Sequence, residues 1–160
     1  MNKKFYLIIS ILLASVLFIC GAFLIINNLG DTVVALGSKK AAVGETVEIP
    51  LSIDKNKGIW GGQIIIKYDS DSLSFVSCEN AGVFDGCEVN NNEGEVVILV
   101  TQNELENTKK DGDVAKLKFK AKISADAGDY DITIDENTNF CNVNEEIIDV
   151  TLKNGKISVK

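Results

Sequence analysis

The chain has 160 residues, of which 46% are hydrophobic, so it has room for one folded domain and an appendage. Its 16 basic residues are all lysines and are outnumbered by 23 acidic residues, and this balance argues against nucleic-acid binding, which needs clustered cations. Histidine and arginine are both absent, which removes the commonest general base and metal ligand, so we predict no enzyme, catalytic residue, metal site or cofactor.

The N-terminus carries a long apolar segment. Lys3 and Lys4 precede an unbroken apolar run at residues 5–26, whose 22 residues would extend roughly 33 Å as a helix, enough to cross a bilayer. The lysines predict a cytoplasmic N-terminus, a single membrane anchor and a domain at the extracellular face. The alternative is a signal peptide cleaved near Cys20–Ala22, after which the domain is secreted. Either way, residues 1–31 are an anchor or signal segment with a short tether, and residues 32–160 are exported.

Short strands separated by turn-forming residues fill residues 32–160, with no sustained helical period. We expect eleven strands, at residues 32–36, 47–53, 58–68, 73–78, 87–90, 96–102, 114–123, 130–134, 140–143, 148–152 and 157–159. Pro50, the only proline, indicates an edge strand because it cannot donate a hydrogen bond to a neighbour. This pattern predicts an all-β domain, a sandwich of the jelly-roll type.

The segment from Val114 to Ile123 has the clearest alternation in the chain. One side of the expected strand carries Leu117, Phe119, Ala121 and Ile123, and the other carries Lys116, Lys118, Lys120 and Lys122. The pattern predicts one face against the core and one in solvent. It also fixes the register, because a slip of one residue would bury four ammonium groups.

Two other expected strands are apolar on both faces, at Ile64–Ile66 and Val96–Val100. Each is either a central strand covered by a loop or part of an exposed sheet face with apolar patches. The second interpretation indicates a protein partner.

The cysteines and the acidic turns are the remaining candidates for a covalent or metal site. Cys78 and Cys87 lie nine residues apart, and export permits a disulfide between them, the alternative being free buried thiols. The acidic turns are interpreted as turn formers, because the one beginning at Asp54 lacks a third oxygen ligand and the closing glutamate of a calcium loop. Trp60, beside two glycines, is expected to fill space in the core.

Five segments, in order, resemble the cohesin domain, the receptor module of cellulosomes. They are VGETVEIPLSI from Val43, GIWGGQIIIKYDSDSL from Gly58, DGDVAKLKFKAK from Asp111, SADAGDYDITIDE from Ser124 and NEEIIDVTLKNGKISV from Asn144. The resemblance implies a nine-stranded jelly-roll β-sandwich without catalytic activity. It also implies a partner, the dockerin module of another protein, in cellulosome-type assembly for polysaccharide degradation. A dockerin is a small helical module that carries its own calcium.

Cohesins bind the dockerin through one sheet face, and the resemblance projects that face onto ten positions. The implied partner-binding residues are Gly61, Gln63, Ile65, Glu88, Asn90, Val97, Leu99, Thr101, Gln102 and Glu145. Gly61 and Gln63 replace the Asn and Asp of the best-known cohesin class, so dockerin specificity does not carry over. The alternative function is a carbohydrate-binding module on the same sandwich, which would hold polysaccharide on exposed aromatic rings.

Overall fold

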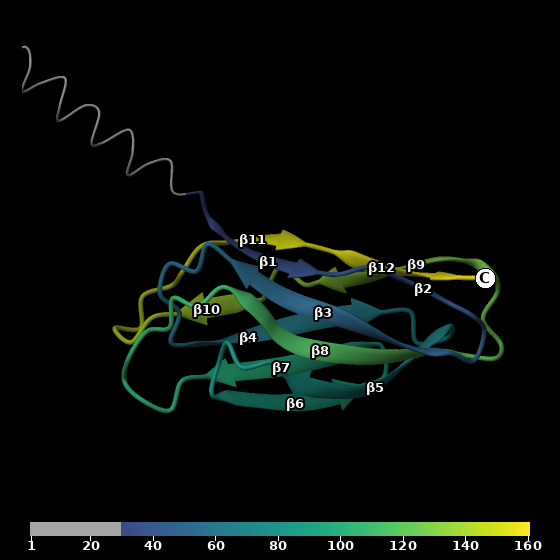
Figure 1. Cartoon of the computed structure of the whole chain (residues 1–160), viewed down its shortest axis with the longest axis horizontal. Helices are drawn as coiled ribbons and strands as arrows, with labels where there is room; N and C mark the ends of the chain where they lie inside the picture. Colours follow the sequence, from purple (N-terminus) through teal and green to yellow (C-terminus); the bar gives the residue numbers. More distant parts are fainter. Residues whose placement is uncertain (1–29) are drawn as a thin grey trace, which may run out of the picture. The chain divides into compact units, whose positions relative to one another are not determined.

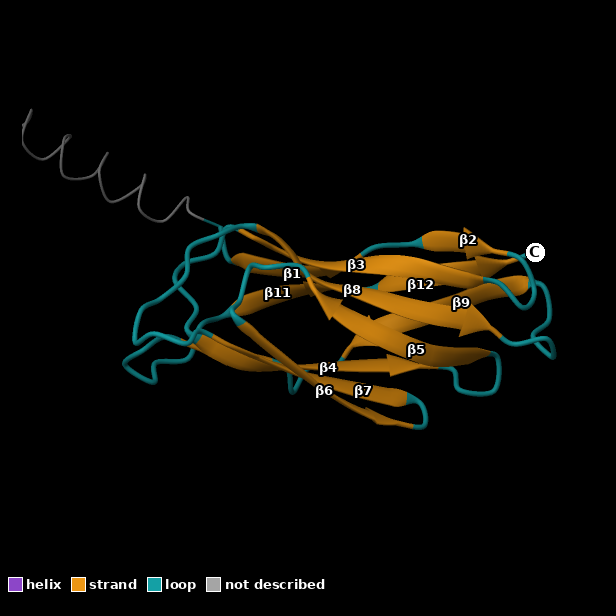
Figure 2. Cartoon of the chain, turned by 60° about the horizontal axis from the view of Figure 1, so that its bottom comes forward, coloured by secondary structure: helices purple, strands orange, loops and turns teal. Residues whose placement is uncertain are grey.

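The computed structural model describes residues 30–160, and the apolar segment predicted at residues 5–26 lies outside them. The described residues form two layers of β-strands, seen in Figure 1 and, tilted, in Figure 2. These described residues include no helix that is long and apolar enough to cross a membrane.

One layer is a five-stranded sheet and the other a seven-stranded sheet. The first contains β1 (Thr32–Leu36), β3 (Thr46–Asp54), β5 (Leu73–Asn80), β8 (Gly112–Ala121) and β11 (Val150–Lys153), in the spatial order β11-β1-β3-β8-β5. The second contains β2 (Lys39–Ala41), β4 (Gly61–Tyr68), β6 (Gly86–Asn92), β7 (Glu95–Thr101), β9 (Gly128–Ile134), β10 (Asn139–Cys141) and β12 (Gly155–Val159). Its order is β2-β12-β9-β4-β7-β6, with β10 also paired to β4.

The predicted all-β sandwich is confirmed. Of the twelve strands in residues 30–160, nine have five residues or more, and β2, β10 and β11 have three or four. Each of the eleven expected strands overlaps an observed one. The missed strand is β2, whose sequence Lys-Lys-Ala has no alternating pattern and which is extended because it pairs with β12.

The two ends of the domain run side by side as one parallel pair. β1 pairs with β11 in the five-stranded sheet, and β2 pairs with β12 in the seven-stranded sheet. The partners are 118 positions apart in both pairs, and the backbone N–H of Lys156 donates to Ser38 Oγ at the same separation. The pair therefore passes from one sheet to the other without losing register, and it closes one side of the sandwich.

Glycines make this passage possible. A Cβ atom on Gly155 would lie 2.1 Å from the carbonyl oxygen of Gly37 and 3.0 Å from Leu36 Cβ. A Cβ atom on Gly37 would in turn lie 2.8 Å from the ring of Pro50. The two strands approach each other here more closely than side chains allow.

The expectation that Pro50 marks an edge strand is wrong, since β3 lies between β1 and β8. The carbonyl of Pro50 accepts a 2.9 Å hydrogen bond from the N–H of Gly37, so the proline nitrogen faces the same neighbour. β1 ends at Leu36, immediately before that point. The nitrogen of Pro50, which has no N–H to donate, therefore faces the place where β1 leaves the sheet.

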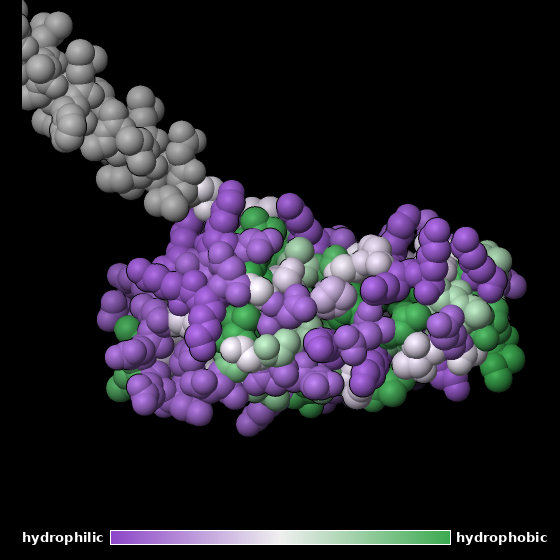
Figure 3. Space-filling view, viewed as in Figure 1, coloured by the Kyte–Doolittle hydropathy of each residue, from purple (hydrophilic) through white to green (hydrophobic). Residues whose placement is uncertain are grey.

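The alternation predicted for β8 is confirmed for most of its length. Leu117, Phe119 and Ala121 are fully buried, and the lysines between them lie on the outer side of the five-stranded sheet. The prediction that Ile123 faces the core is wrong: it is 83% exposed, because β8 ends at Ala121 and the chain turns after it. Hydrophilic side chains cover much of the surface visible in Figure 3.

The core lies between the two layers and includes an aromatic cluster. The ring of Phe119 meets Tyr68 and Phe75 edge to face, with centroid distances of 5.3 Å and 5.5 Å. The prediction that Trp60 fills space in the core is wrong. Trp60 is half-buried, and its indole N–H donates to the carbonyl of Glu104 over 2.9 Å, so it fastens a loop at one end of the sandwich.

We expect Gly155→Ala to lower the free energy of unfolding by about 1–3 kcal/mol or more, because the new methyl group would push the two chain ends apart. Gly128→Ala is the matched control, since a Cβ atom there meets nothing within 4 Å. Urea unfolding of both variants measures the difference. Equal stabilities would contradict a close crossing at Gly155.

Candidate functional site

The two strands that are apolar on both faces, β4 and β7, lie side by side in the seven-stranded sheet. Ile64 and Ile66 on β4, and Ile98 and Val100 on β7, are fully buried against the other sheet. Because successive side chains of a strand point to opposite faces, the residues between them lie on the outer side. β4 and β7 are thus neighbouring central strands, and Leu99 on their outer side is 43% exposed.

The strand register assembles eight of the ten projected residues on this side, in three rows. The rows are Gln63–Leu99–Glu88, Ile65–Val97–Asn90 and Gly61–Thr101–Gly86, each read across β4, β7 and β6. We call the eight residues the outer face: Gly61, Gln63, Ile65, Glu88, Asn90, Val97, Leu99 and Thr101.

The outer face has an apolar centre and a polar margin. Ile65, Val97 and Leu99 lie next to one another on the two central strands. Glu88 and Asn90, on the edge strand β6, are exposed. An apolar centre bordered by polar groups is the usual composition of a protein–protein contact surface.

Gln102 and Glu145 lie apart from the three rows. Gln102 follows the last outward residue of β7, and its side-chain amide donates to the carbonyl of Val83 over 3.2 Å. Glu145 lies in the loop after β10, in a left-handed backbone conformation with φ of 63°. That loop borders the same sheet, because Ile147 bridges to Cys141 and Cys141 pairs with Gly61.

The structure adds an apolar residue that the projected set omitted. Ile147 is 71% exposed and is joined through Cys141 to the row of Gly61 and Thr101. Local sequence patterns could not indicate this, since the residue lies in a loop that only the bridge to β10 brings beside the sheet. The exposed apolar side chains therefore continue beyond β4 toward β10.

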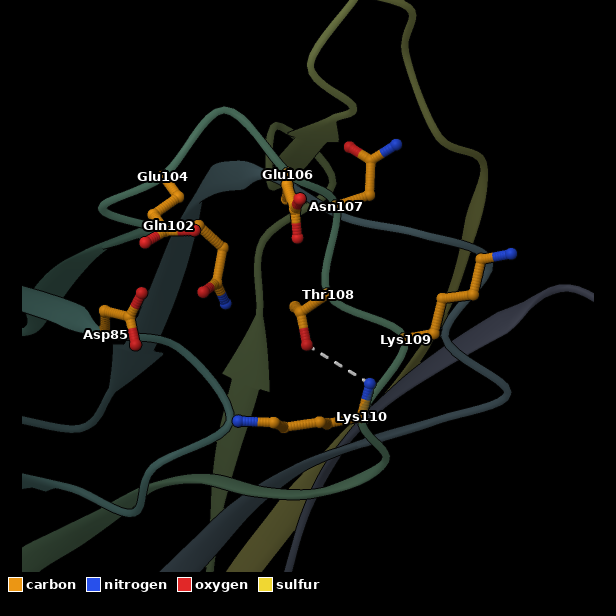
Figure 4. A pocket seen from close by; sticks show the side chains of 8 residues that line it. All are labelled: Asp85, Gln102, Glu104, Glu106, Asn107, Thr108, Lys109 and Lys110. Atoms are coloured by element: carbon orange, nitrogen blue, oxygen red, sulfur yellow. Dashed lines mark hydrogen bonds between the residues drawn. The ribbon is translucent and has the colours of Figure 1, made fainter.

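A polar hollow lies beside the loop that follows β7 (Figure 4). It is lined by Asp85, Gln102, Glu104, Glu106, Asn107, Thr108, Lys109 and Lys110. Lys109 and Asn107 point away from its centre, and the Thr108 hydroxyl accepts a hydrogen bond from the N–H of Lys110. Among residues 30–160, no three His, Cys, Asp or Glu side chains are grouped so that they could hold a metal ion.

An ion pair lies beyond the apolar centre, at the far end of β4. The Lys67 ammonium donates to the Asp135 carboxylate, which also accepts hydrogen bonds from the backbone and side-chain N–H groups of Asn137. These donors, Lys67 first, lower the pKa of Asp135 to about 2. The N–H of Asp135 donates to the carbonyl of Ile65, so the pair is tied to the strand that carries the apolar centre.

The chain matches the family model described as Cohesin domain over residues 32–159. Among solved structures it is similar to the complex of the cohesin CaCohA2 of Clostridium acetobutylicum with a variant of the dockerin CaDoc0917. The TM-score is 0.76 at 24% identity, covering 81% of this chain and 99% of the other. A type I cohesin–dockerin complex of OlpC and Doc435 from Clostridium thermocellum gives a TM-score of 0.72 at 26% identity, covering 81% and 94%.

A third similar structure is a non-cellulosomal cohesin from the archaeon Archaeoglobus fulgidus, with a TM-score of 0.72 at 14% identity. It covers 82% of this chain and 92% of the other. No curated protein matches the chain by sequence.

The ion pair makes stability depend on pH in acid. Because the pKa of Asp135 in the folded state, about 2, is below the value of about 3.9 for an unfolded aspartate, its stabilising effect is present above about pH 4. It is lost as the pH falls toward 2. We therefore expect Asp135→Asn to reduce the fall in Tm between about pH 4 and pH 2, measured by thermal unfolding in buffers of constant ionic strength.

Lys67→Met should flatten the same part of the profile, because it removes the main donor to the carboxylate. Asp131→Asn is the matched control, since that carboxylate accepts no hydrogen bond from residues 30–160. A wild-type slope in both Asp135→Asn and Lys67→Met would contradict the assignment.

Proposed function

The chain belongs to the cohesin domain family, and we propose that its sandwich is a non-catalytic domain that docks dockerin-bearing proteins. The family match carries this proposal, because residues 32–159 include all twelve described strands. Two of the similar structures are complexes with dockerins, which supports the same class of partner here. Any calcium in such a complex would belong to the dockerin.

The outer face supports a protein partner over a polysaccharide. Its central residues, Ile65, Val97 and Leu99, offer apolar area that an opposing protein surface would bury. None of the eight outer-face residues is Phe, Tyr or Trp, so the face offers no aromatic ring on which a sugar could stack. Glu88 at the margin gives the contact a negative charge that favours partners with a basic counterpart.

We propose that eight of the projected residues make the contact directly and that Gln102 and Glu145 act at its border. Gln102 holds the loop of Val83 beside β7, which supports a positioning role. Glu145 lies in the loop that brings Ile147 next to β10 and the sheet. Both residues therefore belong to segments that flank the outer face.

The domain is further proposed to be exported, and either anchored at the extracellular face through residues 5–26 or secreted after cleavage. Lys3 and Lys4 before the apolar run support this orientation. N-terminal sequencing of the protein from membrane and medium fractions distinguishes the two forms. Recovery only from the cytosol would contradict both.

A calcium-dependent pull-down tests the partner class. Residues 32–160 serve as bait for exported proteins of the same organism, and mass spectrometry identifies what a calcium chelator releases. Released proteins that share a duplicated calcium-loop module would establish the docking function, and their other domains would show whether the assembly degrades polysaccharide. No released protein, together with retention of the bait on cellulose, xylan or starch, would favour the carbohydrate-binding alternative.

Leu99→Arg should weaken binding to the captured partner at least about 30-fold, because it replaces a central apolar contact by a charge that binding would bury. Lys118→Ala is the control, since that residue lies on the outer side of the other sheet. It should leave the affinity within about twofold. Calorimetric titration of both variants, with Tm as a check of folding, makes the comparison, and equal losses would contradict the assignment of the outer face.

A further inference from the structure

Two cysteines face each other at the open side of the sandwich, opposite the side that the chain ends close. Cys78 lies on β5, the edge strand of the five-stranded sheet, and pairs with the buried Leu117. Cys87 lies on β6, the edge strand of the seven-stranded sheet, and pairs with the buried Val100. Both side chains therefore point toward the interior, from different sheets, and their Sγ atoms are 3.9 Å apart.

No backbone pairing closes this side within the described residues, since β5 pairs only with β8 and β6 only with β7. The two edge strands are connected by a short loop, in which Phe84 is buried and its carbonyl accepts a hydrogen bond from the Asn80 side chain. A covalent link here would join two edge strands that no backbone pairing joins.

We propose that Cys78 and Cys87 are an oxidation site whose product is a disulfide clasp between the two sheets. A disulfide bond is about 2.05 Å long, so the sulfur atoms must approach by about 2 Å to form it. Both thiols are free and half-buried, which leaves them open to a small reagent at the edge.

The reaction is a thiol–disulfide exchange with an external disulfide such as oxidised glutathione. The thiolate of one cysteine attacks one sulfur of the reagent, which forms a mixed disulfide and displaces the first thiolate of the reagent. The thiolate of the other cysteine then attacks the sulfur of the first cysteine and displaces the second thiolate of the reagent. Two protein thiols are oxidised to one disulfide, the reagent is reduced to two thiols, and these take up the two protons that the cysteines release.

The contact between the thiols also assists the attack. Their hydrogen bond raises the pKa of Cys78 and lowers that of Cys87. Because the thiolate is the nucleophile, a thiolate that accepts a hydrogen bond from its neighbour attacks first, and the neighbour, 3.9 Å away, resolves the mixed disulfide. The geometry of the edge thus provides both an attacking and a resolving cysteine.

The clasp would act on the outer face through β6. This strand is paired on one side only. It carries Glu88, which directly follows Cys87, and Asn90 two residues later. A bond from Cys87 to the other sheet would reduce local opening of the strand. Oxidation would therefore hold one margin of the outer face in place.

The bond is tested on the full chain in detergent, treated either with oxidised glutathione or with a thiol reductant. Cleavage after glutamate separates the cysteines into different peptides, because Glu79 and Glu88 follow Cys78 and Cys87 closely. We expect a linked pair of peptides that ends in Glu79 and Glu88, with a mass two hydrogens below the sum of the free peptides. Thiols that stay free, or a link to Cys20 or Cys141 in place of this one, would overturn the proposal.

The clasp is tested by comparing oxidised and reduced wild-type protein. Oxidation should raise Tm by roughly 5–10 °C and slow hydrogen exchange in residues 80–92. Cys87→Ser should abolish both effects, and Cys141→Ser, the matched control, should retain them. A disulfide that forms without raising Tm or slowing exchange would overturn its role as a clasp. None of these measurements uses a dockerin, so the clasp can fail while docking is established, and the reverse.

Discussion

The parallel pairing of the two chain ends is the constraint on which the rest of the sandwich depends. β1 and β11 in one sheet, and β2 and β12 in the other, keep one register through the crossing at Gly37 and Gly155. The pair thus belongs to both layers and fixes how one sheet lies over the other. It also explains why a proline is tolerated inside the five-stranded sheet, because β1 leaves the sheet opposite Pro50.

With one side closed in this way, the two sheets present different outer surfaces. The five-stranded sheet exposes the lysines of β8, with Glu48 and Glu79 directly opposite Lys118 and Lys116 on the neighbouring strands. Opposite charges across strands favour a solvated surface. The seven-stranded sheet has Leu99 and its apolar neighbours on its outer side, and these side chains offer water no charged group to solvate. The neighbouring apolar side chains on β4 and β7 are consistent with the proposed docking on this sheet.

The sequence indicated much of the fold and part of the site. Short apolar-rich runs between turn-forming residues located eleven strands, because strand periodicity and turn chemistry are local properties of the chain. Runs of consecutive apolar residues indicated that β4 and β7 carry apolar side chains on both faces of their sheet, because successive side chains of a strand point to opposite faces. The sequence analysis missed β2, predicted Ile123 and Trp60 in the core, and predicted that β3 is an edge strand. Each of these depends on a neighbour far along the chain, which local patterns do not report.

The amino-acid sequence by itself determined the strand pattern, the acidic balance and, through five segments in order, the family. Only the tertiary structure decided which strands are neighbours, and with them the rows of the outer face, the approach of Ile147 and the contact of Cys78 with Cys87. The physical reason is that side-chain direction is a property of one strand. Proximity between sheets depends on register and closure, which the paired chain ends set across 118 positions.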